Sequence, residues 1–247
     1  MKVMSRVMML VPVLLATGAG GVAGQGQDWV ATYEGLLQKY VGVGGVRYQA
    51  WHGNKADLAA LGAVVAAVGN ENVSGWPKEE RLAFYLNSYN AWILKEILDD
   101  YPTDGPGGGG FFGRNRFFKS ESIKVAGKVT SFTGLENDVI RAGFKEPRIH
   151  FALNCASASC PPLHARAFRA GTLDATLDLL ARAFLDGDVD GVTVKGGVAY
   201  VSKIFDWFAE DFGGEKGVKA YIDGFRREPL PAKVKYLAYR WKLNETK

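Results

Sequence analysis

Large apolar residues recur mainly at helical spacing along the chain. In residues 28–40, the side chains of Trp29, Tyr33, Leu36 and Tyr40 share one face of a helix. Further segments repeat this pattern and end at glycine, asparagine or a residue before proline, which are typical helix-ending signals. The pattern predicts about seven helices, over residues 28–40, 55–68, 77–101, 133–144, 172–187, 203–212 and 217–225.

Strand patterns are fewer and fall between these helices. Residues 121–132 alternate around a turn at Ala126 and Gly127, and residues 191–202 alternate in the same way, so each segment predicts a β-hairpin. Further extended segments are predicted at residues 46–51, 148–154 and 233–243. Because the helices and strands do not alternate regularly, we predict an α+β fold. It would be a single domain with a mostly antiparallel sheet surrounded by about seven helices.

A glycine-rich segment interrupts these patterns at residues 103–118. Four consecutive glycines, Gly107 to Gly110, disfavour regular structure, and aromatic residues follow them directly. We expect this segment to be either a mobile insertion or a lid.

The first 24 residues have the layout of a secretory signal peptide. Lys2 and Arg6 precede a short apolar run, Val7 to Ala16, and small residues follow it. The run is too short for a membrane-spanning helix. We therefore predict a signal peptide at residues 1–24, a domain at residues 25–247, and a periplasmic or secreted protein with no membrane attachment after cleavage.

Charge argues against nucleic acid as a partner. The formal net charge is +4 and falls to +2 without Lys2 and Arg6. Basic residues are scattered among acidic ones, with no basic run or stripe. The acidic residues Asp206, Glu210 and Asp211 are expected to face solvent. No motif indicates a cofactor, and the glycine run lacks the Lys-Ser/Thr of a phosphate-binding loop.

Both cysteines and two of the three histidines fall within HFALNCASASCPPLH, residues 150–164. Cys155 follows a predicted strand and is surrounded by small residues, so a substrate could reach its thiol. A thiolate nucleophile needs a base and a group that orients the base. His150 and His164 are candidate bases, and Glu136 on the preceding predicted helix is a candidate orienting group.

Three other interpretations of this cluster stay open. His150 can be a core histidine in an apolar strand. Cys155 and Cys160 can form a disulfide, because an exported protein meets an oxidising compartment and the short intervening segment can turn tightly. Zinc binding by both cysteines with His150 and His164 is conceivable, although the Cys-x4-Cys spacing matches no common zinc knuckle, and we predict no metal.

Two asparagines stand out in LAFYLNSYNAW. Asn87 and Asn90 are three residues apart on one face of a strongly apolar predicted helix, where buried amides need partners. They belong either to a structural hydrogen-bond network or to a site.

Four motifs in this order resemble the family catalogued as domain of unknown function 547 (DUF547): FYLNSYNAWIL, LENDVIR, PRIHFALNCASASCP and IFDWFAEDFGG. The resemblance covers roughly Arg81 to Asn244. It implies one mixed helical and antiparallel-sheet domain and no established reaction. The residues that match the family pattern are Asn87, Asn90, Glu136, His150, Asn154, Cys155, Cys160 and Pro161.

These observations favour a thiol-dependent hydrolase or an acyl or amide transferase acting on a peptide-like or small-molecule substrate. Cys155 is the predicted nucleophile, His150 the general base and Glu136 the group that holds the imidazole. Asn90, or the amides after Asn154, would stabilise an oxyanion. Because His150 precedes Cys155, that order would suit a rearranged thiol-peptidase-like fold. The alternative function is a non-catalytic binding or scaffold domain with a Cys155–Cys160 disulfide.

Overall fold

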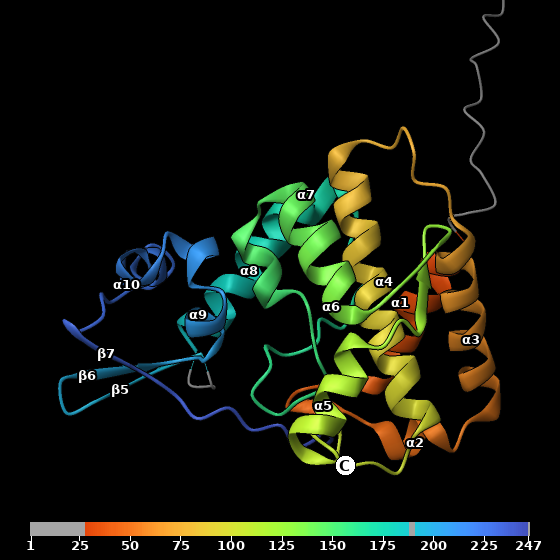
Figure 1. Ribbon diagram of the computed structural model, residues 1–247, viewed down its shortest axis with the longest axis horizontal. Helices are drawn as coiled ribbons and strands as arrows, with labels where there is room; N and C mark the ends of the chain where they lie inside the picture. The colour runs from red at the N-terminus through yellow and green to blue at the C-terminus, as the bar shows by residue number, and fades with distance from the viewer. Residues whose placement is uncertain (1–27, 188–190, 247) are drawn as a thin grey trace, which may run out of the picture.

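The structure, a computed structural model, describes residues 28–187 and 191–246, so the predicted signal peptide lies outside the described residues. Helices dominate it, and they form a larger and a smaller lobe (Figure 1). No helix within the described ranges has the length and apolarity to span a membrane. The larger lobe contains α1 (Asp28–Tyr40), α2 (Tyr48–His52), α3 (Lys55–Asn70), α4 (Lys78–Asp99), α5 (Gly110–Lys119), α6 (Phe132–Gly134) and α7 (Ala142–Phe144).

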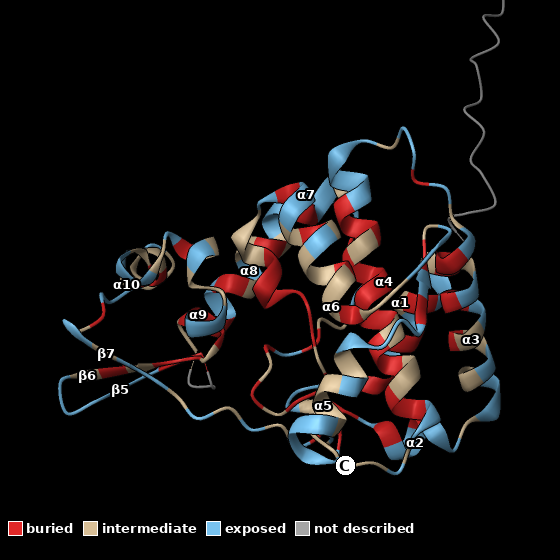
Figure 2. Ribbon diagram, in the orientation of Figure 1, coloured by how far each residue is buried: buried red, intermediate tan, exposed pale blue. Residues whose placement is uncertain are grey.

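Helix α4 is the centre of the larger lobe. Its middle turns from Leu86 to Leu94 are buried almost continuously, as expected of a helix that is covered on several sides (Figure 2). α3 packs against it, and two short hairpins complete the lobe. These hairpins are β1 (Val41–Gly42) with β2 (Gly45–Val46), and β3 (Ile123–Val125) with β4 (Lys128–Thr130).

The smaller lobe is built on a three-stranded sheet and has its own hydrophobic core around Phe151, Phe205 and Phe212. α8 joins the lobes, because Leu177 packs in the larger core and Phe184 in the smaller one. The elements of this part are η3 (Ala170–Thr172), α8 (Leu173–Leu185), β5 (Val192–Lys195), β6 (Val198–Val201), α9 (Ile204–Trp207), η4 (Ala209–Phe212), α10 (Glu215–Asp223) and β7 (Lys233–Tyr236).

The predicted α+β class is confirmed, and the strands in the described part of the chain form three small sheets rather than one. β1–β2, β3–β4 and β5–β6 pair antiparallel, whereas β7 pairs parallel to β6. Both predicted hairpins are present. The predicted strand at residues 233–243 is shorter than expected, because pairing with β6 stops at Tyr236.

Two extended segments were predicted wrongly. Residues 46–51 are mostly the helix α2. Residues 148–154 contain no strand, because Pro147–Phe151 forms the 3₁₀-helix η2, whose first turn is capped by the side chain of Glu146. A short apolar run has no periodicity that separates a buried strand from a buried helical turn, and here the proline and the cap decide for the turn.

A C-terminal strap, residues 237–246, leaves the small sheet and runs back across the larger lobe, where its end lies near α2 and α5 (Figure 1). Ala158 N donates a hydrogen bond to Lys242 O (2.7 Å), and Asn244 N donates one to Ala156 O (3.0 Å). The strap also joins the first hairpin, because Val46 N donates to Asn244 O (3.0 Å). Residues far apart in the sequence therefore meet along this strap.

The glycine-rich segment lies against the strap. Its second half belongs to the helix α5, which the sequence pattern did not predict. A Cβ atom on Gly107 would lie 2.5 Å from Trp241 Cβ, and one on Gly105 would lie 2.9 Å from Leu243 N. These glycines therefore allow two backbone segments to approach closely.

We expect Gly107→Ala to lower the free energy of unfolding by about 1–3 kcal/mol, because the added methyl group would force the strap away from the segment. Urea unfolding would measure the change. Gly143→Ala is the matched control, since that helical position has open space for a Cβ atom and should gain stability slightly. Equal stabilities for the two variants would contradict the close approach.

Candidate active site at the cysteine loop

The loop at residues 152–161 carries both cysteines, and Asn90 on α4 fixes its start. Asn90 Nδ2 donates a hydrogen bond to Ala152 O (2.9 Å), and Asn90 Oδ1 accepts one from Asn154 N (2.9 Å). Both ends of this buried amide are therefore used by the backbone. Asn90 does not line the cavity described below, and its contacts make it a positioning residue for the loop.

Asn154 gives the loop its internal shape. Its Nδ2 donates to Pro161 O (2.8 Å), and its Oδ1 accepts from Ala156 N (2.9 Å). Asn244 of the strap donates to the same oxygen (3.2 Å). These bonds hold Ala156 at a φ of 62°, in the left-handed region that residues with a Cβ atom rarely adopt. Backbone strain of this kind, of the order of 1–3 kcal/mol, is typical of functional sites.

Asn87 has a structural place away from the loop. It pairs with the backbone of Phe168, donating to the carbonyl (2.9 Å) and accepting from the amide (2.8 Å). It does not line the cavity described below. Asn87 and Asn90 therefore lie on the same helix but bind two different backbone segments.

Cys155 is half-buried and surrounded by hydrogen-bonding groups. Its Sγ atom lies 3.1 Å from Ser157 Oγ and 3.2 Å from Tyr239 Oη, while its amide donates to Cys160 Sγ (3.0 Å). Hydrogen bonding from the Cys160 thiol, supported by Ser157 and Tyr239, outweighs burial and lowers the pKa of Cys155. Burial and the neighbouring Cys155 raise the pKa of Cys160. Both cysteines are free, and Cys155 has the stronger thiolate character.

His150 is buried beneath the ring of Phe208, with ring centroids 4.2 Å apart. Its Nε2 atom lies 2.7 Å from Asp211 Oδ2, and Arg141 Nε donates to the same oxygen (2.6 Å). Hydrogen bonds from His150 and Arg141 hold the pKa of Asp211 well below its usual range, despite burial. Asp211 therefore does not face solvent as predicted. It holds the imidazole in the place that sequence reasoning assigned to Glu136.

This pairing determines the state of the His150 ring. The Asp211 carboxylate can only accept hydrogen bonds, so Nε2 carries the proton. Burial lowers the pKa of His150, which favours the neutral imidazole. The Nδ1 atom is then unprotonated and lies 3.8 Å from Glu136 Oε1, beyond hydrogen-bond distance. A neutral imidazole with a free lone pair is the form of histidine that acts as a general base.

Glu136 lies on the π-helix η1 (Leu135–Arg141), a rare element that often occurs at functional sites. Burial raises its pKa to about 7, and the nearby charge of Cys155 adds to this effect. The hydroxyl of Tyr89 donates a long hydrogen bond to Oε2 (3.5 Å). A carboxyl group with this pKa can give and accept protons near neutral pH.

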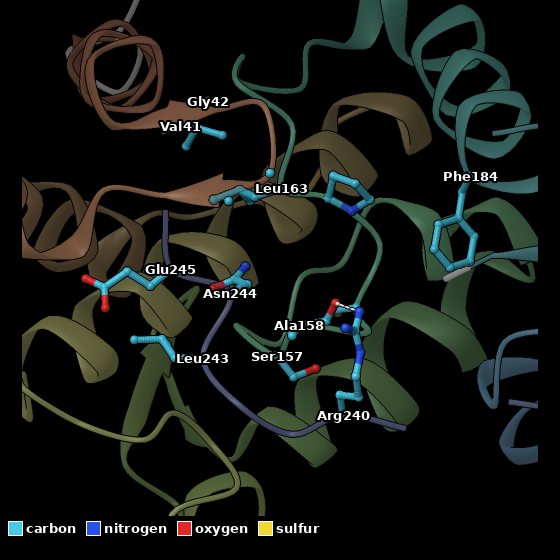
Figure 3. A pocket seen from close by; sticks show the side chains of 14 residues that line it. Val41, Gly42, Ser157, Ala158, Leu163, Phe184, Arg240, Leu243, Asn244 and Glu245 are labelled. Atoms are coloured by element: carbon cyan, nitrogen blue, oxygen red, sulfur yellow. Dashed lines mark hydrogen bonds between the residues drawn. The ribbon is translucent and has the colours of Figure 1, made fainter. Parts of the chain in front are cut away.

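A cavity of about 320 Å³ brings these groups together. The residues that line it include Cys155, Cys160, His150, Glu136 and Tyr239, whereas Asn87, Asn90 and Asn154 do not. A second cavity of about 440 Å³ also reaches Cys160 (Figure 3). There Arg240 lies beside Ala158 and Ser157, and Glu245 lies near Leu243. The first cavity alone joins a thiol to a base and an acid, so we take it as the candidate active site.

Among the described residues, no cluster of three or more histidine, cysteine or acidic side chains is arranged to hold a metal ion. His164, the other candidate base, contacts Phe168 and lines neither cavity.

We expect Glu136→Gln to change how stability depends on pH. The folded-state pKa of about 7 exceeds the usual value of 4.5, so the folded protein binds the extra proton between these pH values and becomes less stable as pH rises through them. Because glutamine cannot ionise, the variant should gain up to about 3 kcal/mol over the unsubstituted protein between pH 4 and pH 8. Urea unfolding at several pH values would measure this gain.

Glu146→Gln is a control with the opposite sign. The hydrogen bonds from Arg148 overcome the effect of burial and lower the pKa of Glu146, so its ionised form stabilises the fold. This variant should lose stability relative to the unsubstituted protein as pH rises from 4. Parallel pH profiles for the two variants would contradict the raised pKa of Glu136.

Comparison with known proteins gives one match. Residues 73–185 match the model of a family described as "Protein of unknown function, DUF547". This segment contains α4, Glu136, His150 and the cysteine loop, and it is shorter than the stretch over which the motifs resemble the family. Asp211 and Tyr239 lie outside it. No curated protein and no solved structure matches the chain.

Proposed function

The chain carries a DUF547 domain over residues 73–185, and from the geometry of its site we propose that it is a thiol-dependent hydrolase or acyl or amide transferase. One observation carries the proposal: Cys155, with a lowered pKa, lines the same cavity as the neutral His150 and the protonatable Glu136. Functional thiols have this combination of partial exposure, lowered pKa and adjacent base. A peptide-like or small-molecule ester or amide is the proposed substrate.

The proposed reaction has two halves. The Cys155 thiolate attacks the carbonyl carbon, a C–S bond forms, and the carbonyl electrons move to oxygen. The C–O or C–N bond then breaks, and the leaving group takes a proton from the acid–base groups of the cavity. The resulting thioester is attacked by water or by an amine, which gives its proton to the same groups. The C–S bond then breaks and the thiolate returns.

His150 and Glu136 share the acid–base role in this proposal. The hydrogen bonds of Cys155 Sγ go to Ser157 and Tyr239, so His150 is not needed to form the thiolate. The unprotonated Nδ1 of His150 suits the activation of water or an amine in the second half. Glu136, whose Oε1 atom lies 3.8 Å from Nδ1, can pass a proton between the imidazole and the leaving group or the attacking water or amine.

The oxyanion is best served by Tyr239. Its hydroxyl is a polar group within the cavity and lies next to the sulfur. The amide of Cys155 is already bonded to Cys160, and that of Ala156 is bonded to Asn154. A hydroxyl beside the nucleophile can turn from the thiolate to the carbonyl oxygen as negative charge moves there.

Alkylation by iodoacetamide as a function of pH tests the proposal. Because thiolate is the reactive form, Cys155 should label rapidly at pH 7, and its rate should fall only when pH drops below its lowered pKa. An ordinary thiol reaches half its maximal rate near pH 8.5. Mass spectrometry of peptides assigns the label. Cys155→Ser should remove the fast phase, and Cys160→Ser should move it to higher pH, because Cys160 contributes most to the lowered pKa.

The alternative is a binding or scaffold domain with a Cys155–Cys160 disulfide. It is favoured by the closeness of the two residues, since the amide of one contacts the sulfur of the other. Labelling only after reduction, together with an intact mass lower by two hydrogens, would support this alternative and overturn the enzyme.

Export is part of the same proposal, since the redox conditions of the compartment determine whether the two thiols are free or oxidised. The mass of protein recovered outside the cytoplasm would test it. A chain that begins near Gln25 is expected, whereas an intact chain starting at Met1 would contradict signal cleavage.

A further inference from the structure

Aromatic rings form one wall of the active-site cavity. Trp207 follows the small sheet, whereas Tyr239 and Trp241 belong to the strap, and their ring centroids lie 4.6–5.7 Å apart in all three pairs. Phe118 of α5 extends the wall toward Trp241 (6.2 Å). Trp207 is 45% exposed and Phe111 at the rim is 65% exposed. This exposure leaves ring faces available to a bound group.

The charged side chains at the rim of this wall are basic. Arg114 lies over the ring of Trp241, 4.5 Å from its centroid. Lys119 lies at the end of the same helix, α5. Both line the cavity. Within residues 28–187 and 191–246, no carboxylate forms an ion pair with either of them. The acidic residue lining the same cavity is Glu136, which is only partly exposed.

These two features together select a class of ligand. Aromatic walls bind flat apolar rings by stacking and edge-to-face contact, and they also attract cations. Here a cation would meet Arg114 and Lys119, whereas an anion would gain charge-assisted hydrogen bonds. A volume of about 320 Å³ suits a group of the size of a substituted benzene ring next to the reacting bond.

We infer that the cavity accepts a substrate with an aromatic ring and an anionic group, the ring lying on Trp207, Tyr239 and Trp241 and the anion meeting Arg114 and Lys119. This inference rests on the proposed function, because it names the substrate class of the same thiol. α5 then selects the substrate by charge, while the strap and Trp207 of α9 supply the ring-binding surface.

Four alkylating probes of Cys155 test the inference. They are iodoacetamide, N-benzyl iodoacetamide, its 4-carboxylate and its 4-aminomethyl derivative. Each rate constant is divided by that of the same probe with glutathione, which removes intrinsic reactivity. We expect the anionic aromatic probe to react about tenfold faster than the neutral one and the cationic probe to react slowest. The double variant Arg114→Gln, Lys119→Gln should lose this order.

Matched variants separate the ring from the charge. Arg116→Gln removes a basic residue from the same helix, but Arg116 lines a different cavity, next to α4, so the order of the probes should persist. Trp207→Ala should reduce the advantage of N-benzyl iodoacetamide over iodoacetamide about threefold to tenfold, with the anionic preference retained.

The outcomes distinguish this inference from the proposed function. Fast labelling by iodoacetamide with equal normalised rates for all four probes would overturn the substrate class and leave the thiol enzyme standing. For a thiol that does not react, calorimetric titration of the Cys155→Ser variant with N-benzoylglycine and with the neutral N-benzoylglycinamide gives a second readout. Tighter binding of N-benzoylglycine would support the inferred ligand class even if Cys155 is not a nucleophile. Equal binding of both compounds, or no binding, would overturn it.

Discussion

The Asp211→Asn variant is expected to lose turnover of p-nitrophenyl acetate by about 10³-fold, with the first acetyl transfer to Cys155 largely retained. Asparagine can donate a hydrogen bond to His150 Nε2, which favours the tautomer with the proton on Nδ1 and removes the base from the cavity. Loss of an orienting carboxylate in a nucleophile–histidine pair has effects of this order. Stopped-flow measurement of nitrophenol release would separate the burst from the steady rate.

Two further measurements distinguish positioning from general damage in this variant. The hydrogen bond to Asp211 raises the pKa of the imidazole. In the variant, the pH below which the residual turnover rate falls should therefore shift to a lower value. Glu210→Gln, an exposed neighbour, is the matched control and should keep its turnover. Steady-state turnover within threefold of the unsubstituted protein would show that His150 is not the base of the second half-reaction.

Asn90→Leu is expected to lower the free energy of unfolding by about 3–5 kcal/mol. Leucine fills nearly the same volume, but it leaves the carbonyl of Ala152 and the amide of Asn154 buried without partners. Each orphaned group costs about 1–3 kcal/mol. Guanidinium unfolding would measure the loss, and the labelling profile of Cys155 should move toward that of an ordinary thiol as the loop start is released.

Ser88→Ala is the matched control for Asn90→Leu. Ser88 is equally buried on the same helix, and its hydroxyl donates only to Phe84 O, one turn earlier (2.7 Å). That carbonyl keeps its backbone hydrogen bond, so the change should cost less than about 1 kcal/mol. Losses of similar size in both variants would mean that Asn90 acts through general packing and not through the cysteine loop.

Periodic patterns and local clusters were enough for much of this structure. The long helices at residues 28–40, 55–70 and 78–99 follow from apolar spacing over many turns, and both hairpins follow from alternation around a glycine-containing turn. Cys155, Cys160, His150 and Glu136 were selected from the sequence, and they line one cavity. The buried asparagines were recognised from polar residues on an apolar helix face.

Contacts between distant segments could not be predicted in the same way. Tyr239 reaches Cys155 only because the strap crosses the larger lobe, and no local pattern marks it. Asp211 was assigned to solvent because it stands among other acids. The sequence did contain a sign that Asp211 is not fully exposed, because it stands between Phe208 and Phe212. In the structure the rings of both contact His150. The glycine-rich segment looked irregular because it is rich in glycine. In the structure its glycines allow close backbone packing, which sequence alone does not reveal.

The strap also sets an order of events during synthesis. Tyr239 follows Cys155 by 84 residues, and the hydrogen bonds that hold the cysteine loop from the strap side come later still. A nascent chain therefore displays Cys155 long before the surroundings that lower its pKa are complete. Until the strap docks, the contributions of Cys160 and Ser157 to the lowered pKa of Cys155 are available, but that of Tyr239 is missing. Docking of the strap would thus complete the surroundings of Cys155 after the rest of the fold has formed.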